Sequence, residues 1–128
     1  MEEIEKQKIR SFTDLRAWKE GHYLVLLLYK TTKDFPREEQ FGLTNQLHRA
    51  AVSVTSNIAE GFSRRSFKEK TQFYSMALGS LTELQNQILI ARDVGYINKE
   101  NFSKIAEQSV VVSKIINGLI KSSISRNT

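Results

Sequence analysis

The sequence predicts an all-α protein, folded as an antiparallel up-down-up-down four-helix bundle. Apolar residues recur every three or four positions through most of the chain, which is the period of a helix buried on one side. Proline, glycine and capping residues break this pattern at three places and leave connections of only a few residues, which favour antiparallel neighbours. We therefore expect helices at about 14–33, 37–62, 66–94 and 98–122.

The length of 128 residues fits a single domain, which we place at residues 12–122. Residues 1–11 are mostly charged and are expected to form a flexible N-terminal lead-in. Residues 123–128 are expected to form a C-terminal tail.

The first helix is bounded by a capping residue and a proline. Thr13 is a candidate N-cap, and Asp14 would place negative charge in the first turn. Phe35-Pro36 ends the helix, because a residue before proline is disfavoured in the helical region. A strand at YLVLLLY (23–29) is the main alternative, but leucine richness inside a longer helical pattern argues against it.

The second helix is predicted to begin after Pro36, whose missing N–H costs nothing in a first turn. Its apolar residues follow helical spacing at Leu47, Ala50, Ala51, Val54 and Ile58. Gly61 is expected to end this pattern.

Local capping signals bound the last two helices. Ser66 and Glu69 form a predicted capping box at the start of the third helix. Gly95 suits the left-handed position that follows a helix, and Asn98 can cap the fourth helix. The predicted core stripes comprise Phe73, Ala77, Leu81, Leu84, Ile88 and Ala91 in the third helix, and Phe102, Ile105, Ser109, Val112, Ile116 and Leu119 in the fourth.

Composition limits the possible functions. Cysteine is absent, which excludes disulfides and thiolate chemistry and fits a reducing cytoplasm. The longest apolar run, 23–29, is far shorter than the roughly 20 residues of a membrane span, and the N-terminus lacks the apolar segment of a secretory signal. Neither His22 nor His48 has a partner at metal-ligand spacing, so we expect no metal and no cofactor. The net charge of +5 permits nucleic-acid binding.

The first and fourth helices carry more apolar surface than one bundle can bury. A helix that is apolar on nearly every side must be buried on nearly every side. We therefore expect self-association through the outer faces of these two helices. Scattered surface leucines are the alternative. The expected interface residues are Leu24, Leu26, Leu27, Val111 and Ile115.

A row of polar residues runs beside the apolar row of the second helix. We interpret it as an interhelical lock, with an Arg49–Glu83 contact, because buried polar groups must be paired and then fix helix register. A catalytic Glu60 or Glu83 is the alternative, but no general acid–base partner accompanies either, and we expect no enzyme. The predicted lock comprises Arg49, Ser53, Asn57, Glu60 and Glu83.

A basic turn follows the second helix. Arg64, Arg65, Lys68 and Lys70 lie between Phe62 and Phe67 or close after them, and a second basic group includes Arg16 and Lys19. Such cations can hold phosphates of RNA or DNA, and exposed phenylalanines can stack on bases. In the alternative, the turn is merely solvated and its phenylalanines tuck under the end of the bundle.

Three segments carry a resemblance to a known family: FTDLRAWKEG at 12–21, DFPREEQFGLTNQLHRAAVSVTSNIAEGFSRRS at 34–66 and FYSMALGSLTELQNQILIARDVGYI at 73–97. The chain resembles the bacterial four-helix bundle family that includes the 23S rRNA intervening-sequence proteins. It is also similar to the accessory variability determinant proteins of diversity-generating retroelements. The resemblance covers roughly residues 12–120.

This resemblance implies a homopentameric barrel and supplies no catalytic residues. For the accessory members it also implies contact with a reverse transcriptase and with nucleic acid. Our first hypothesis is therefore a non-enzymatic, oligomeric, cytoplasmic helical protein that binds RNA, DNA or a nucleoprotein partner through basic surface. The second is a structural protein–protein scaffold whose charge is incidental.

Overall fold

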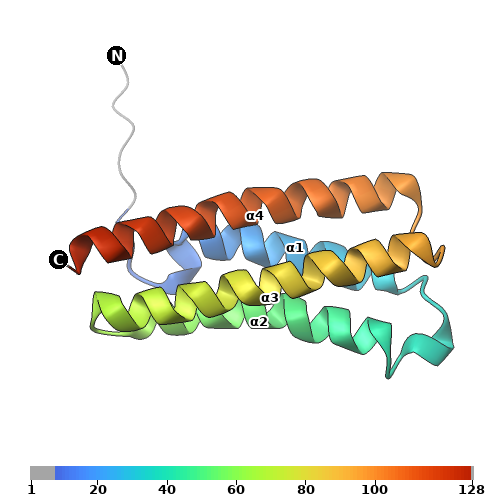
Figure 1. Ribbon diagram of the computed structural model, residues 1–128, viewed down its shortest axis with the longest axis horizontal. Coiled ribbons are helices and arrows are strands. Elements are labelled where there is room, and N and C mark those ends of the chain that lie inside the picture. The colour runs from blue at the N-terminus through green and yellow to red at the C-terminus, as the bar shows by residue number, and fades with distance from the viewer. Residues whose placement is uncertain (1–7, 128) are drawn as a thin grey trace, which may run out of the picture.

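The computed structural model describes residues 8–127 and confirms the predicted all-α four-helix bundle. Figure 1 shows the helices lying side by side, with the α2–α3 connection and the end of α4 at one end of the bundle. Within 8–127 there is no strand, and 23–29 lies inside a helix. The elements in chain order are η1 (Phe12–Asp14), α1 (Arg16–Thr32), η2 (Arg37–Glu39), α2 (Leu43–Ser63), α3 (Phe67–Asp93) and α4 (Lys99–Arg126).

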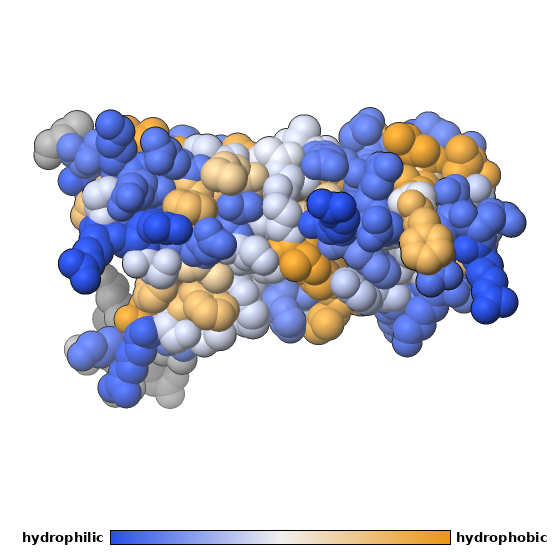
Figure 2. Space-filling model, turned by 90° about the horizontal axis from the view of Figure 1, so that it is seen from below, coloured by the Kyte–Doolittle hydropathy of each residue, from blue (hydrophilic) through white to orange (hydrophobic). Residues whose placement is uncertain are grey.

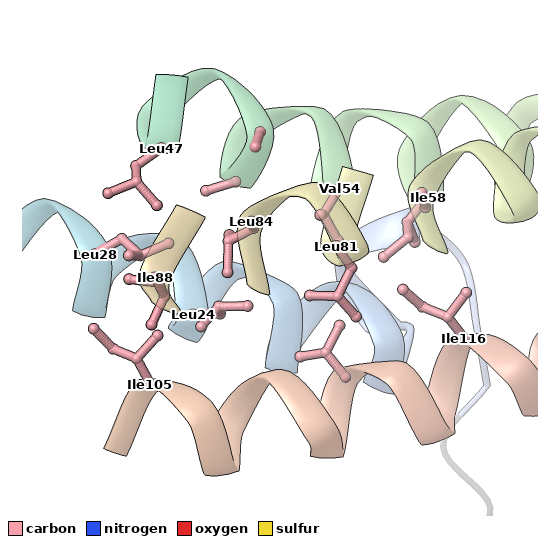
Figure 3. Close-up of a cluster of buried hydrophobic side chains, with 14 of the residues drawn as sticks. Leu24, Leu28, Leu47, Val54, Ile58, Leu81, Leu84, Ile88, Ile105 and Ile116 are labelled. Carbon is pink, nitrogen blue, oxygen red and sulfur yellow. The ribbon is translucent and has the colours of Figure 1, made fainter. Parts of the chain in front are cut away.

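The core lies along the axis of the bundle. Each helix packs against its two neighbours around the bundle, so that α1 contacts α2 and α4, and α3 contacts the same two helices. Figure 3 shows side chains from all four helices meeting between them. The fully buried large side chains are Leu24, Leu28, Leu47, Val54, Ile58, Leu81, Leu84, Ile105, Val112 and Ile116. The predicted stripes of the last two helices are thus largely confirmed.

The first helix begins at Arg16, later than predicted, because residues 12–14 form the separate short turn η1, which Ser11 rather than Thr13 caps. The Ser11 side chain accepts a hydrogen bond from the Thr13 amide, and the Asp14 carboxylate accepts from the amides of Arg10 and Ser11 at 2.9 and 3.1 Å. These backbone bonds lower the pKa of Asp14. They close the short turn η1, and an extended Leu15 separates it from α1.

The second helix also begins later than predicted, at Leu43 instead of residue 37. Pro36 opens only the single turn η2, and Gly42 then takes a non-helical conformation with φ −111° and ψ −116°. The chain between them forms a corner that carries Phe41, whose side chain is 88% exposed.

Gly61 lies inside α2 and does not end it, which corrects its predicted role. The helix continues to Ser63, and Gly61 is buried against α3. A Cβ atom at this position would lie 2.7 Å from Cε1 of Tyr74. The glycine therefore allows the two helices to approach closely next to their connecting turn.

The predicted N-caps Ser66 and Asn98 are confirmed, but the Ser66–Glu69 capping box is only half formed, because the Glu69 carboxylate accepts from the Ser66 hydroxyl at 3.3 Å instead of from the Ser66 amide. The Ser66 hydroxyl accepts from the Glu69 amide at 3.1 Å, and Asn98 Oδ1 accepts from the Asn101 amide at 2.8 Å. Gly95 has φ +85°, in the left-handed region that favours glycine.

The ends of the chain differ from the expected lead-in and tail. The helix α4 continues to Arg126, with Ser123 buried, so most of the predicted tail 123–128 is helical. Residue 128 and residues 1–7 of the expected lead-in 1–11 lie outside the described residues.

Candidate functional site

The basic turn lies at one end of the bundle, where α2 passes into α3. Arg64 is the C-cap of α2, and the side chains of Arg65 and Lys68 are exposed. The Arg64 guanidinium lies 4.5 Å from the ring centroid of Phe73 and 3.8 Å from the carboxylate of Glu60. Arg64 is thus held in a defined direction, although its side chain remains 42% exposed.

Lys70, the last predicted cation of the turn, is used within the fold. Its Nζ donates hydrogen bonds to the carbonyl oxygens of Phe62 at 2.6 Å and Gly61 at 3.3 Å. These carbonyls belong to the last turn of α2, where intrahelical donors run out, and the Gly61 oxygen also accepts from the Arg64 amide at 3.2 Å. Burial lowers the pKa of Lys70. The side chain therefore caps α2, which removes Lys70 from the freely available cations.

The two phenylalanines of the turn are half-buried, as the alternative interpretation expected. Phe62 packs against the core. The Phe67 ring lies under the guanidinium of Arg126, 5.6 Å from its centroid. Arg126 is a residue that sequence reasoning missed, because it ended the fourth helix at 122. We call Arg64, Arg65, Lys68 and Arg126 together the basic end.

Arg16 and Lys19 are exposed in the first turns of α1. Arg16 lies at a hollow of about 530 Å³ between α1 and α4, which we call the α1/α4 hollow. Its lining is mainly apolar with two cations, and comprises Arg16, Val111, Lys114, Ile115, Gly118 and Leu119.

The predicted interface residues fall in different environments. Leu26 is 54% exposed and Val111 is 36% exposed, while Leu27 and Ile115 are half-buried. Leu24 is only 1% exposed, so its assignment to an outer face is wrong. The buried row of α1 runs through Ala17, Gly21, Leu24, Leu28 and Thr32.

The polar row of α2 forms an interhelical link only at its centre. The Ser53 and Ser80 hydroxyls are 2.7 Å apart across α2 and α3, and Asn57 Nδ2 donates to the carbonyl and hydroxyl oxygens of Ser53 at 2.8 and 3.1 Å. Glu60 instead pairs with Arg64 at the end of its own helix. The expected Arg49–Glu83 contact is missing from the ion pairs of residues 8–127.

Arg49 and Glu83 nevertheless line the same hollow, of about 420 Å³, between α2 and α3. Glu83 accepts a hydrogen bond from Gln87 Nε2 at 3.1 Å. Gln87 is 3% exposed, and its Oε1 has no hydrogen-bond partner. We call this site the polar hollow; its lining residues are Phe41, Asn45, Gln46, Arg49, Ala50, Ser53 and Glu83. Figure 2 shows the face seen from below, over α2 and α3, where apolar patches are separated by hydrophilic residues.

Both histidines stack on aromatic rings. His48 lies 4.0 Å from the Tyr29 ring, and its Nε2 is 2.8 Å from the Thr32 hydroxyl oxygen. That hydroxyl already donates to the Leu28 carbonyl oxygen, so His48 Nε2–H is the donor. Burial lowers the pKa of His48. His22 stacks on Trp18 at 4.6 Å.

Neither a metal site nor a membrane-spanning helix is found among residues 8–127. Across residues 8–127 no three histidine, cysteine or carboxylate side chains gather in a way that would hold a metal ion. In the same range, none of the helices combines the length and the apolar character that crossing a membrane requires.

Comparison with known proteins identifies a family and a similar fold among solved structures. A family model described as 23S rRNA-intervening sequence protein matches residues 13–118. A solved structure from Bacteroides thetaiotaomicron VPI-5482, a protein of unknown function from the S23 ribosomal protein family, is similar with 18% sequence identity and a TM-score of 0.75. That match covers 82% of this chain and 95% of the other, and at this identity it shows the fold alone. No curated protein matches the chain.

Proposed function

Because this chain belongs to the 23S rRNA-intervening sequence protein family, we propose that it is a non-enzymatic, self-associating helical bundle that binds nucleic acid through its basic end. The nucleic acid is RNA or DNA, free or in a nucleoprotein such as a reverse transcriptase complex. The similarity to retroelement accessory proteins stays a prediction.

The observation that carries this proposal is the convergence of cations at the basic end. Arg65 lies in the α2–α3 turn and Lys68 in the first turn of α3, while Arg126 lies at the end of α4 and packs over Phe67. Guanidinium and ammonium groups close together bind phosphates and release counterions, which makes binding depend on salt. Phe67 packs beneath Arg126, and Phe62 packs against the core, so both rings are half-buried.

Self-association is supported by apolar surface that the bundle leaves open. Tyr23 is 51% exposed and Leu26 is 54% exposed on α1, and the α1/α4 hollow is lined largely by aliphatic side chains. We propose a homopentamer. Such an assembly repeats the basic end in each subunit, so weak contacts would combine into much tighter binding.

The absence of catalysis is part of the proposal. Glu60 pairs with Arg64, Asn57 bonds to Ser53, and the Ser53 hydroxyl bonds to Ser80 on α3. These polar groups hold helices or surface side chains in place. None forms the pair of nucleophile and base that acyl or phosphoryl transfer would need.

A structural scaffold is the second candidate. It is favoured by the engagement of Arg64 with Glu60 and Phe73, which leaves fewer cations free for phosphates. In that case the apolar outer faces meet other proteins and the charge serves solubility.

A salt titration of nucleic-acid binding separates the two candidates. We expect the triple variant Arg64→Gln, Arg65→Gln, Lys68→Gln to bind RNA and DNA more weakly. The slope of log affinity against log salt should fall by about 2 to 3, roughly 0.9 for each duplex phosphate that the variant no longer neutralises. Lys30→Gln, Lys33→Gln, Lys99→Gln, at the other end of the bundle, is the matched control. Equal slopes for the two triple variants would refute the nucleic-acid role of the basic end.

Self-association is tested by sedimentation equilibrium. We expect a pentamer at micromolar concentration, and Leu26→Glu should shift the distribution towards smaller species. A monomer under these conditions would refute self-association.

A further inference from the structure

The polar hollow contains two opposite charges that do not neutralise each other. Arg49 stands on α2 and Glu83 on α3, and both line the hollow. Neither belongs to an ion pair among residues 8–127. A ligand with hydrogen-bond acceptors on one edge and donors on another could therefore bind between them.

The Glu83 carboxylate is held from below. Gln87 lies one turn further along α3, is almost fully buried, and donates its Nε2–H to Glu83 at 3.1 Å. In this position its own Oε1 is buried without a partner, which is an unfavourable arrangement. Gln87 thus acts as a positioning residue for the Glu83 carboxylate. An apolar side chain could fill the same space without leaving a buried oxygen unpaired, so filling space does not explain the glutamine.

An aromatic ring borders the same hollow. Phe41 lies on the corner before α2, and its side chain is 88% exposed. An exposed ring beside polar side chains offers a face on which a planar ligand can stack. The amides of Asn45 and Gln46, also in the lining, add donors and acceptors around that plane.

We propose that the polar hollow binds a guanine base of single-stranded nucleic acid, an inference that rests on the nucleic-acid binding proposed above. The Glu83 carboxylate accepts hydrogen bonds from N1–H and the N2 amino group. The Arg49 guanidinium donates to O6 and N7, and Phe41 stacks on the ring.

The carboxylate makes the site selective for guanine. Adenine and cytosine present a ring nitrogen acceptor where guanine has N1–H, so that two acceptors would face each other. Uracil offers a single N–H between two carbonyl oxygens, and these repel a carboxylate. A base-paired guanine has its N1–H and N2 amino group engaged, so only a single strand can bind in this way.

The test uses fluorescently labelled uridine oligomers that contain one central guanine or one central adenine, with the DNA equivalents as separate arms. We expect the guanine oligomer to bind about tenfold more tightly than the adenine oligomer. Glu83→Gln and Gln87→Leu should reduce this preference, measured in each variant as the ratio of the affinities for the guanine and adenine oligomers. Glu107→Gln, a carboxylate on α4, is the control.

Several outcomes would overturn the proposal. One is equal affinity for the guanine and adenine oligomers, and another is a preference that persists in Glu83→Gln. Salt-dependent binding without base preference would leave the basic end as the binding surface and remove the guanine site.

If neither oligomer binds, guanosine monophosphate tests the polar hollow on its own. Amide chemical shifts of Asn45 and Gln46 that respond to this nucleotide and not to adenosine monophosphate would support the hollow alone. No response to either nucleotide would refute it. If the preference for guanine is equal in the RNA and DNA oligomers, the site recognises the base and not the sugar.

Discussion

The close approach of α2 and α3 at Gly61 predicts a stability change of opposite sign to the usual one. In a helix interior, glycine to alanine normally stabilises by about 1 kcal/mol, because alanine has less backbone freedom to lose. In Gly61→Ala, however, the new methyl group would lie 2.7 Å from Cε1 and 2.9 Å from Cδ1 of Tyr74, and 3.1 Å from Cβ of Phe73. Contacts this short require one helix to move.

The magnitude follows from the burial of the neighbour. Tyr74 is 4% exposed, so its ring cannot rotate into solvent to make room. Overpacking of this kind costs about 1–3 kcal/mol, and these short contacts to a buried ring place it near the upper value. After the gain of about 1 kcal/mol in helix propensity, we expect Gly61→Ala to lower the free energy of unfolding by about 2 kcal/mol.

Gly79 provides the matched control, because it also lies inside a helix and a Cβ atom added there would meet no other side chain or helix within 4 Å. Gly79→Ala should therefore raise the free energy of unfolding by about 1 kcal/mol. Urea unfolding followed by far-ultraviolet circular dichroism, at one protein concentration, measures both variants. If Gly61→Ala proves as stable as Gly79→Ala, the reasoning from close packing is refuted.

Three further predictions concern single side chains. Gln87→Leu should raise the free energy of unfolding by about 1 kcal/mol, because it removes a buried carbonyl oxygen that lacks a partner; a clear loss of stability in urea would contradict this. The pKa of His48 is lowered by burial, so the unfolded chain binds its proton more readily than the fold does. Stability should thus be complete above a pH of about 6.5, the unfolded value, and fall as pH drops below it through the lower folded pKa. His48→Gln should flatten this dependence, and urea midpoints from pH 7.5 to 5.5, about one unit either side of that value, provide the check. Lys70→Met should lower the free energy of unfolding by roughly 1 kcal/mol, since the Phe62 carbonyl oxygen loses its Lys70 donor, while the Gly61 oxygen keeps the Arg64 amide. Its affinity for RNA should change less than that of Arg65→Gln, and the reverse order in a filter-binding assay would contradict the capping role.

The N-caps of α3 and α4 were predictable because they depend on nearby residues, whereas the cap predicted at Thr13 is at Ser11. Ser66 and Asn98 bond to amides three positions ahead, and Gly95 satisfies a local conformational need. The late start of α2 could not be predicted in this way. Pro36 is compatible with the first turn of a helix, and the turn that it opens ends only at the corner formed by Gly42.

Features that depend on packing were harder to predict. The leucines of α1 occupy nearly every side of the helix, so periodicity alone did not decide that Leu24 faces the core. A glycine near a helix end reads as a stop, whereas Gly61 serves a contact with α3. Lys70 and Arg126 act on groups across a turn or from another helix, and no short sequence pattern encodes such contacts.

The position of Gly61 also bears on the order of events in folding. Its contact with Tyr74 lies beside the α2–α3 turn, so the chain closes only a short loop to make it. Contacts of this kind form early, and α2 and α3 can then zip together away from the turn. We expect Gly61→Ala to slow refolding more than it speeds unfolding in stopped-flow urea experiments. The opposite partition would show that this end of the bundle assembles late.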